Sequence, residues 1–534
     1  FNSKLTYTVI FDILRNFIIQ ADSDISCDWK GIIKSSIGDF AQVFLDIIPE
    51  LSEIIGEEDL TTPELTPQEL LFQRNRIFAR MICNLCIVGK PIVVFLDDLQ
   101  WADSESIDLI EEIIGFAPKN LMMILSYRDN EISSVSPMSY FLNCSNRFGV
   151  KHRDILLSNL GEVSIREWLN DIIPNANEAV KKVAQLAYAK TEGNPLYLTS
   201  IFQQILDNKY IHNDNDGKTI FDLDAIADLP ADSDVVFFLI GKINSLDETT
   251  RDFLLELSIL GRTFSVNIVE QIFSSSRDDL QLLIARLIEF HLIVRVGDKI
   301  KFAHDKVLQA VRGQIGAEKF SSLNLKFGKI IKANLVMKGQ QNEYIEAYID
   351  YFNSAHALID DENDKAELHR LNVSLGQRLK SNAAYQAAEN YYQHAILFLP
   401  DNAYIQGNDS LAFLLMEYGE ILFLNHEYDK GEAQFAKAIK LTTHPKIKAK
   451  IYSKQILHYG YQSESEKAIK IARNALQELD IQIPEKYIKF HLYKGLIKIF
   501  LLLKGKPPEA ILDMLQTDNP KVVAQMELLS AASG

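Results

Sequence analysis

The sequence is poor in cysteine and proline and has no long uninterrupted apolar run. Four cysteines in 534 residues are typical of a reducing compartment, so we expect a cytoplasmic protein. The most apolar stretch, residues 487–506, is interrupted by Lys489, His491, Lys494 and Lys498, which argues against a membrane-spanning helix. With 15 prolines and a hydrophobic share of 47%, the composition excludes a disordered or fibrous chain.

An excess of basic charge is also absent. The chain has 55 Lys and Arg against 72 Asp and Glu, and the net charge of −17 opposes non-specific binding to nucleic acid or to an anionic membrane. We therefore expect no direct nucleic-acid partner. Cys83 and Cys86 form a C-x-x-C pattern inside an apolar helical run with no second ligand pair nearby, which favours buried core thiols over a metal or redox site.

The first 160 residues have the pattern of an α/β domain. Helical spacing leads up to an apolar run, 92–96, which predicts a buried strand of a parallel sheet. A helix at 104–117, with Ser104 or Asp103 as its cap, and a second strand at 121–128 follow, and a short third strand is expected at 154–160. Because strands alternate with helices, we predict a parallel-sheet domain over residues 1–160.

Two smaller domains are predicted next. Residues 161–227 contain three helical segments and a hairpin centred on Asp216 and Gly217, which indicates a helical subdomain. Residues 228–316 contain helices that end in two strands around Gly297, the pattern of a winged helix. This segment has ten Lys and Arg against thirteen Asp and Glu, a net charge of −3, so a structural spacer is favoured over a DNA-binding wing.

Residues 317–534 are helical and contain a weak repeat. Segments 383–396 and 426–439 superimpose at an offset of 43 residues, and a third copy lies at 463–476. The first two copies match residue by residue at four apolar positions: Tyr385 with Tyr428, Tyr392 with Phe435, Ala395 with Ala438 and Ile396 with Ile439. A period near 40 predicts a tetratricopeptide-like α-solenoid, although core packing alone accounts for these residues. Its concave face is a candidate surface for a protein partner.

Two adjacent acids, Asp97 and Asp98, close the first predicted strand. In one interpretation they are a helix cap and a solvated loop residue. In the other they form a Walker B motif, in which the first carboxylate organises Mg²⁺ and the second polarises the attacking water. Arg128 stands at the end of the next predicted strand and would reach the same crevice, where a guanidinium can contact a γ-phosphate.

Two later segments fit the second interpretation, and each also has a structural explanation. In EGNPLYL, Gly193 suits a bend and Pro195 the first turn of a helix. In FAHDKV, His304 and Asp305 close the predicted winged helix, where a lone histidine is more often a satisfied structural group.

Taken in order, VVFLDDLQWAD, SYRDNE, EGNPLYL, a winged helix and FAHDKV resemble the STAND class of signal-transduction ATPases. They are similar in particular to the ATPase module of large bacterial regulators that join a Ser/Thr kinase, this ATPase and a sensor histidine kinase. The resemblance covers nearly the whole chain. It implies a partial P-loop NTPase sheet, ATP and Mg²⁺ as cofactors, and attached kinase or histidine kinase modules as partners.

The resemblance also assigns roles to seven residues of this sequence. Asp97 would organise the metal, Asp98 would be its catalytic neighbour and Arg128 the arginine that senses the γ-phosphate. A second group would pack on the nucleotide or hold its ADP-bound state: Gly193, Asn194, Pro195 and His304.

One part of a nucleotide site is missing. No G-x-x-x-x-G-K-[ST] loop occurs, and none of the Gly-Lys pairs has the spacing to wrap phosphates. In the family this loop precedes the Walker B strand. Together with Phe1 in place of Met, its absence leads us to expect a truncated copy, inactive by itself.

The sequence therefore predicts a nucleotide-dependent signalling switch within a larger kinase protein. A first alternative is a transcriptional regulator in which the same ATPase and solenoid control a DNA-binding module outside these residues. A second is a non-catalytic scaffold that binds partners through the solenoid.

Overall fold

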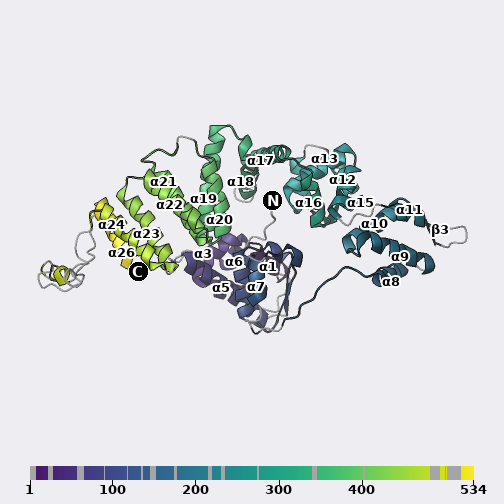
Figure 1. Ribbon diagram of the computed structural model, residues 1–534, viewed down its shortest axis with the longest axis horizontal. Helices are drawn as coiled ribbons and strands as arrows, with labels where there is room; N and C mark the ends of the chain where they lie inside the picture. Colours follow the sequence, from purple (N-terminus) through teal and green to yellow (C-terminus); the bar gives the residue numbers. More distant parts are fainter. Residues whose placement is uncertain are drawn as a thin grey trace. The chain divides into compact units, whose positions relative to one another are not determined.

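In the computed structural model the chain divides into two compact units (Figure 1). One joins residues 1–151 with 361–534, and the other is 152–360. The four predicted domains stay a prediction. The described residues are 8–21, 28–56, 65, 67–88, 91–116, 118–133, 136–144, 149, 152–173, 177–213, 219–229, 235–273, 276–338, 345–400, 403–462, 464–481, 493–498, 501 and 519–533.

The first unit begins with helices and a two-stranded sheet and continues with helical repeats. Its N-terminal elements are α1 (Thr8–Ala21), α2 (Trp29–Ile37), η1 (Gly38–Phe40), α3 (Ala41–Ile47), η2 (Pro49–Leu51), α4 (Ser52–Ile55), α5 (Pro67–Val88), β1 (Ile92–Leu96), η3 (Leu99–Trp101), α6 (Ser104–Gly115), β2 (Leu121–Leu125), η4 (Asp129–Glu131) and α7 (Pro137–Cys144). Its repeat helices are α19 (Glu362–Ser381), α20 (Tyr385–Leu397), α21 (Asp409–Leu424), α22 (Tyr428–Leu441), α23 (Pro445–Tyr461), α24 (Ser465–Glu478) and α26 (Pro520–Ser533).

The parallel sheet predicted from the two apolar runs is present. Strands β1 and β2 pair in parallel, with Leu96 opposite Leu125. Val94 and Leu96 are buried on one face, in the same core cluster as Phe78 of α5. The helix between the strands begins as the sequence suggested, because the Asp103 carboxylate accepts the N–H of Ser106 at 2.8 Å.

The other face of this sheet is exposed, and here the prediction of a fully buried strand is wrong. Four alternating side chains are 60, 59, 59 and 41% exposed: Val93, Phe95, Met122 and Ile124. A parallel sheet normally has both faces covered, but no element of the described part of the chain covers this one.

The third strand predicted at 154–160 is also absent. This segment has no ladder partner among the described residues, and Leu156 and Leu157 are 85 and 89% exposed. An apolar run becomes a strand only where a neighbouring strand can pair with its backbone, and none is available here.

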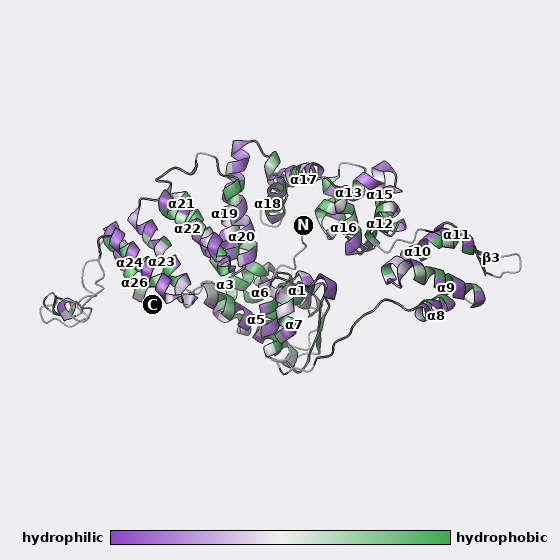
Figure 2. Cartoon of the chain, in the orientation of Figure 1, coloured by the Kyte–Doolittle hydropathy of each residue, from purple (hydrophilic) through white to green (hydrophobic). Residues whose placement is uncertain are grey.

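The repeat helices form antiparallel hairpins, and each hairpin packs on the next (Figure 1). Tyr392 and Phe435, which match in the sequence repeat, are both fully buried. Each lies against a glycine of the preceding helix, Gly376 or Gly419, where an added Cβ would approach the ring to 3.2 or 3.1 Å. The two glycines are again 43 residues apart, so the repeat pairs a small residue on one helix with an aromatic on the other. In Figure 2 these helices carry hydrophilic and hydrophobic residues together, as helices with one buried face do.

The second unit is mainly helical with two small sheets. Its elements are α8 (Glu162–Ile172), α9 (Asn177–Thr191), α10 (Pro195–Asp207), β3 (Ile211–Asn213), β4 (Thr219–Phe221), α11 (Leu223–Asp228), α12 (Val235–Asn244), α13 (Glu248–Leu257), η6 (Ser258–Leu260), β5 (Thr263–Ser265), α14 (Val266–Ile272), α15 (Arg277–Glu289), β6 (Ile293–Val296), β7 (Lys299–Phe302), α16 (Asp305–Gly313), α17 (Ala317–Lys338), α18 (Ile345–Ser354) and η7 (His356–Leu358).

Both hairpins predicted for this unit have paired strands. Strands β3 and β4 are antiparallel, while the turn expected at Asp216 and Gly217 lies outside the described residues. Strands β6 and β7 pair antiparallel around Gly297, and β5 adds to β7 to give the order β5-β7-β6. Apolar residues from α8 to α16 form one continuous core cluster, so the helical subdomain and the three-stranded sheet pack as one body.

Cys83 and Cys86 lie on α5 and are buried. Burial and, to a smaller extent, the neighbouring Cys83 raise the pKa of Cys86 to about 11. Both side chains therefore pack as neutral thiols. Among the described helices, none is long and apolar enough to cross a membrane.

Candidate functional site

The C-terminal ends of β1 and β2 bring together three predicted site residues. Asp97 and Asp98 directly follow β1, and Arg128 lies three residues beyond β2. Backbone hydrogen bonds extend the pairing past the strands, because Ser126 N–H donates to Leu96 O at 2.9 Å and Leu99 N–H donates to Ser126 O at 3.0 Å. The acids and the arginine are thus held at one edge of the sheet, where ligands of parallel sheets bind.

Asp98 is buried and conformationally unusual. Its backbone is left-handed, with φ 60° and ψ 37°, and its relative exposure is 7%. The Asp98 Oδ1 atom accepts a hydrogen bond from Gln100 Nε2 at 3.0 Å and lies 3.6 Å from Arg128 Nη2. A left-handed backbone at a non-glycine residue costs roughly 1–3 kcal/mol and is found most often at functional sites.

Asp97 is exposed, and its orientation is fixed from two sides. Its Oδ1 atom accepts the Ser126 hydroxyl from β2's end and the N–H of Asp98, the latter at 3.1 Å. The two hydrogen bonds aim the carboxylate without enclosing it. Asp97 is therefore the more accessible of the two acids.

Arg128 has partners on several sides. Its Nη1 atom lies 2.9 Å from Glu131 Oε1, and its guanidinium carbon lies 5.5 Å from the centre of the Trp101 ring. The backbone N–H of Arg128 donates to Gln100 Oε1 at 3.1 Å. Gln100 thus contacts both the acid and the arginine loop, and these contacts fix the Arg128 side chain beside Asp98.

Sequence reasoning did not single out Ser126, Gln100 or Trp101. Ser126 and Gln100 are polar residues next to strand ends, and Trp101 follows the acid pair by three residues. Their position in the sequence was a usable signal, but their contacts depend on the pairing of β1 with β2.

The acid pair fits a magnesium ion that is held mainly by water and phosphate. Mg²⁺ is usually bound through one or two carboxylates together with substrate phosphates, not by an all-protein cage. Asp97 offers one oriented, exposed carboxylate of this kind. No cluster of three or more acidic, His or Cys ligands is found within the described ranges, so the remaining ligands would be water and phosphate oxygens.

Gly193, Asn194 and Pro195 form the start of helix α10 in the second unit. The Asn194 side chain accepts the N–H groups of Leu196 and Tyr197 at 3.0 and 3.2 Å, and Pro195 occupies the first helical position. Gly193 has φ +76°, and a Cβ there would lie 1.9 Å from the carbonyl oxygen of Leu160. The bend and the helix start predicted for these residues are confirmed; their role in nucleotide binding stays a prediction.

His304 caps helix α16, also in the second unit. Its Nδ1 atom accepts the N–H of Lys306 at 3.1 Å. The next residue, Asp305, forms an ion pair with Arg262 Nε at 2.9 Å. This is the structural role that the sequence analysis gave as the alternative, and the assigned contact with nucleotide stays a prediction.

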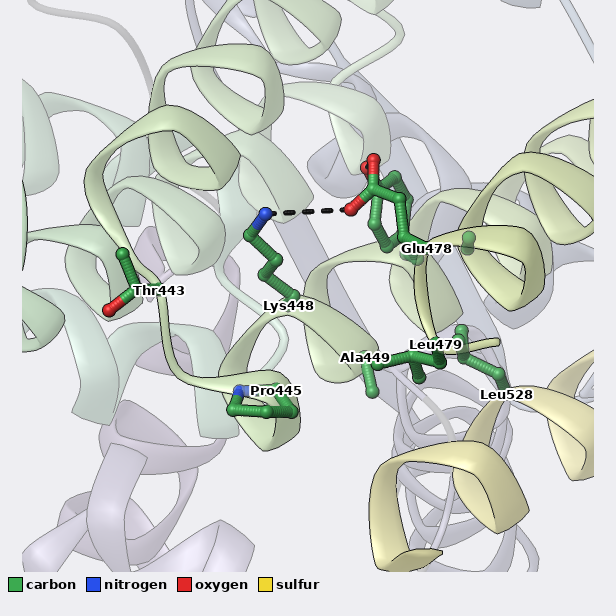
Figure 3. A pocket seen from close by; sticks show the side chains of 9 residues that line it. Thr443, Pro445, Lys448, Ala449, Glu478, Leu479 and Leu528 are labelled. Atoms are coloured by element: carbon green, nitrogen blue, oxygen red, sulfur yellow. Dashed lines mark hydrogen bonds and ion pairs between the residues drawn. The ribbon is translucent and has the colours of Figure 1, made fainter. Parts of the chain in front are cut away.

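A cavity of about 130 Å³ lies in the repeats, between α23, α24 and α26 (Figure 3). Lys448 Nζ lies 3.4 Å from Glu478 Oε2 at its rim, and apolar side chains, including Ala449, Leu479 and Leu528, line it. None of its nine lining residues belongs to the predicted nucleotide site.

The chain has distant similarities to known proteins. No family model matches the chain. Hybrid signal transduction histidine kinase G of Dictyostelium discoideum is 18% identical over an alignment of 645 residues, which covers 96% of this chain and 18% of that protein. The chain therefore spans less than a fifth of the length of this relative. Among solved structures, a signal transduction ATPase with numerous domains (STAND) that carries a tetratricopeptide repeat sensor, from Pyrococcus horikoshii, is 16% identical, with 93% of this chain and 69% of that chain covered and a TM-score of 0.38.

Proposed function

We propose that this chain is part of a nucleotide-dependent signalling switch, in which Asp97, Asp98 and Arg128 form one side of an ATP site. The observation that carries the proposal is the meeting of an oriented exposed acid, a buried acid in a left-handed conformation and an arginine at the ends of two parallel strands. In this arrangement Asp97 would hold the metal, Asp98 would orient the attacking water and Arg128 would contact the γ-phosphate. The similarity to a signal transduction histidine kinase supports a signalling context.

The phosphate-binding part of the site would come from a segment outside residues 1–534. The sequence has no phosphate loop, and the exposed face of β1 and β2 is apolar over Val93, Phe95, Met122 and Ile124. A parallel sheet completed by further strands and helices would cover this face. Kinase or histidine kinase modules attached to the same protein would then receive the signal.

A direct test is Mn²⁺ binding, followed by the electron paramagnetic resonance signal of the free ion. We expect weak binding that is lost in Asp97→Asn and kept in the control Asp129→Asn, because Asp129 is an exposed acid of the neighbouring loop whose Oδ1 accepts the N–H of Asn130. Equal binding by the two variants would contradict the role of Asp97.

The nucleotide prediction has two parts. Residues 1–534 alone should not bind ATP tightly, and nanomolar affinity would refute a phosphate site supplied from outside.

In a longer protein that includes a phosphate loop, Asp98→Asn should keep ATP binding and slow hydrolysis by about 100-fold or more. Unchanged turnover there would remove Asp98 from the mechanism.

A second candidate function, partner binding by the repeats, is favoured by the cavity between α23, α24 and α26. Its apolar lining and the Lys448–Glu478 pair at the rim suit an apolar side chain of a protein partner with polar groups beside it (Figure 3). This function is compatible with the switch and would also serve a scaffold without catalysis.

A further inference from the structure

Helix α6, which follows the acid pair, contacts the first repeat hairpin through a buried carboxylate. Glu105 is 6% exposed, and its Oε1 atom accepts the N–H of Tyr385 at 2.8 Å. Tyr385 is the first residue of α20, 280 positions away in the sequence. Glu105 therefore caps a helix of the repeats from the N-terminal part of the same unit.

Helix α20 has no side-chain cap from its own preceding residue. The residue before α20 is Ala384, which has no side chain to accept a hydrogen bond. The next two second helices of the repeats, α22 and α24, have glutamates at this place, Glu427 and Glu464, which bring a negative charge to the helix start without accepting a cap hydrogen bond. An acid near a helix N-terminus is favourable, so the first repeat lacks its own carboxylate at the position where α6 brings one in.

A buried arginine holds the other side of the same loop. Arg74 of α5 is fully buried, and its Nη1 atom donates to the carbonyl oxygen of Asn382 at 2.5 Å. Its other nitrogens donate to Asn75 Oδ1 at 3.1 and 2.8 Å. Burial raises the pKa of Glu105 to about 7, although Arg74 and the N–H groups of Tyr385 and Gln386 favour its ionised form. The loop from Asn382 to Gln386 is thus held between two buried side chains of the N-terminal part, Arg74 and Glu105.

The contact is continuous with the acid pair through packed side chains. Ala384 is buried in the same core cluster as Leu99 and Ala102, which connect Asp98 to the start of α6. The loop residue Ala383 has φ +57° and is fully buried in the core cluster of the repeats, so the two ends of this loop pack into different cores. A displacement of the hairpin would move α6, and only five residues, 99–103, lie between Asp98 and the first residue of α6.

We propose that Glu105 and Arg74 are positioning residues, which couple the first repeat hairpin to the acids at the end of β1. The loop 382–386 and the N-terminal turn of α6 move together, so a partner that bends the repeats changes the geometry of Asp98 and Arg128. The meaning of that change for ATP rests on the proposed function, whereas the mechanical coupling does not.

The test is hydrogen–deuterium exchange mass spectrometry of the whole chain. In Glu105→Ala, exchange of the backbone over 384–388 should rise about tenfold because the cap is lost. If the coupling exists, exchange over 97–103 and 126–131 rises as well. Glu105→Gln keeps an acceptor oxygen and should retain most of the protection, and Glu112→Ala on the same helix is the matched control.

Acceleration confined to 384–388 would show a local cap without coupling and would overturn the proposal. Should Glu105→Ala fail to fold, Arg74→Lys gives the same measurement, because it keeps the charge and loses the forked hydrogen bonds to Asn382 and Asn75. Exchange unchanged at the acid pair in that variant would be an equally negative result. The metal and nucleotide experiments have separate readouts, so either proposal can fail alone.

Discussion

Gly193→Ala is expected to destabilise the unit of residues 152–360 by about 2–4 kcal/mol. Two costs combine. A non-glycine residue at φ +76° is strained, and the new Cβ would lie 1.9 Å from the carbonyl oxygen of Leu160, which belongs to the backbone and cannot rotate away. The backbone would have to shift, and the hydrogen bond from Leu160 N–H to Gly193 O, 2.9 Å long, would be lost with it.

The measurement is urea unfolding followed by the fluorescence of Trp168, with Trp29 and Trp101 replaced by phenylalanine in every variant. Trp168 lies in this unit, and the centre of its ring is 5.0 Å from the centre of the Phe202 ring. Its fluorescence therefore reports on the packing of α8 against α10. The matched control is Gly241→Ala in helix α12, where a Cβ meets nothing within 4 Å. That change should stabilise the unit by about 0.5–1 kcal/mol.

The comparison of these two glycine substitutions also tests why a glycine stands before Asn194 and Pro195. If Gly193→Ala behaves as expected, the local fold requires the glycine without any nucleotide. A loss of stability below about 0.5 kcal/mol would contradict the steric argument and would leave ligand contact as the better reason for the glycine.

The sequence predicted local features well because local rules decide them. The end of β1, the start of α6 and the start of α10 depend on residues close together in the chain. The second strand was predicted three residues too long, to Arg128, because β2 ends at Leu125. Asp98 and Arg128 were expected at one sheet edge because consecutive parallel strands end on the same side, and the structure places them 3.6 Å apart.

Features that depend on distant partners could not be predicted in this way. The run at 154–160 has the apolar pattern of a strand, but whether it pairs is decided by a neighbour and not by its own residues. The contact of Glu105 with Tyr385 spans 280 positions, and Ser126 finds Asp97 only after β1 and β2 have paired. Burial of one sheet face is likewise decided by what covers it.

Glu420→Gln is expected to have the second large effect, a loss of about 3–5 kcal/mol in the stability of the repeats. Glu420 of α21 is 2% exposed and accepts Lys380 Nζ and Lys454 Nζ, both at 2.6 Å. The amide would leave Lys380, whose side chain is 14% exposed, with Glu417 as its only acidic partner in this network. Removing one partner of a buried pair costs far more than the pair itself contributes, because the remaining charge stays desolvated.

The same network sets a pH dependence. Burial raises the pKa of Glu420, but Lys380 and Lys454 outweigh it and lower the pKa to about 2. An acid whose pKa is lowered in the folded state stabilises that state above its ordinary pKa of 4.5, and this contribution is lost as the pH falls from 4.5 toward 2.

The buried His458 affects stability at higher pH. Burial lowers its pKa from 6.5 to about 4, so the folded state holds a neutral imidazole. Its contribution to the stability of the folded state is lost as the pH falls from 6.5 to 4.

Hydrogen–deuterium exchange of the α21 backbone measures both the loss of stability and its dependence on pH. Glu420→Gln should exchange about 100-fold faster than the unaltered protein at pH 7, and the ratio should shrink as the pH falls below 4.5, since the carboxylate then loses its own charge. The matched control is Glu464→Gln, which removes the 2.5 Å ion pair between Glu464 and Lys467. The side chain of Glu464 is 43% exposed and that of Lys467 is 60% exposed. A surface pair contributes at most about 1 kcal/mol, so the control should change exchange little. Equal effects of the two substitutions would mean that Glu420 is not held between desolvated lysines, and the repeats would then depend on the packing of aromatic rings against glycines alone.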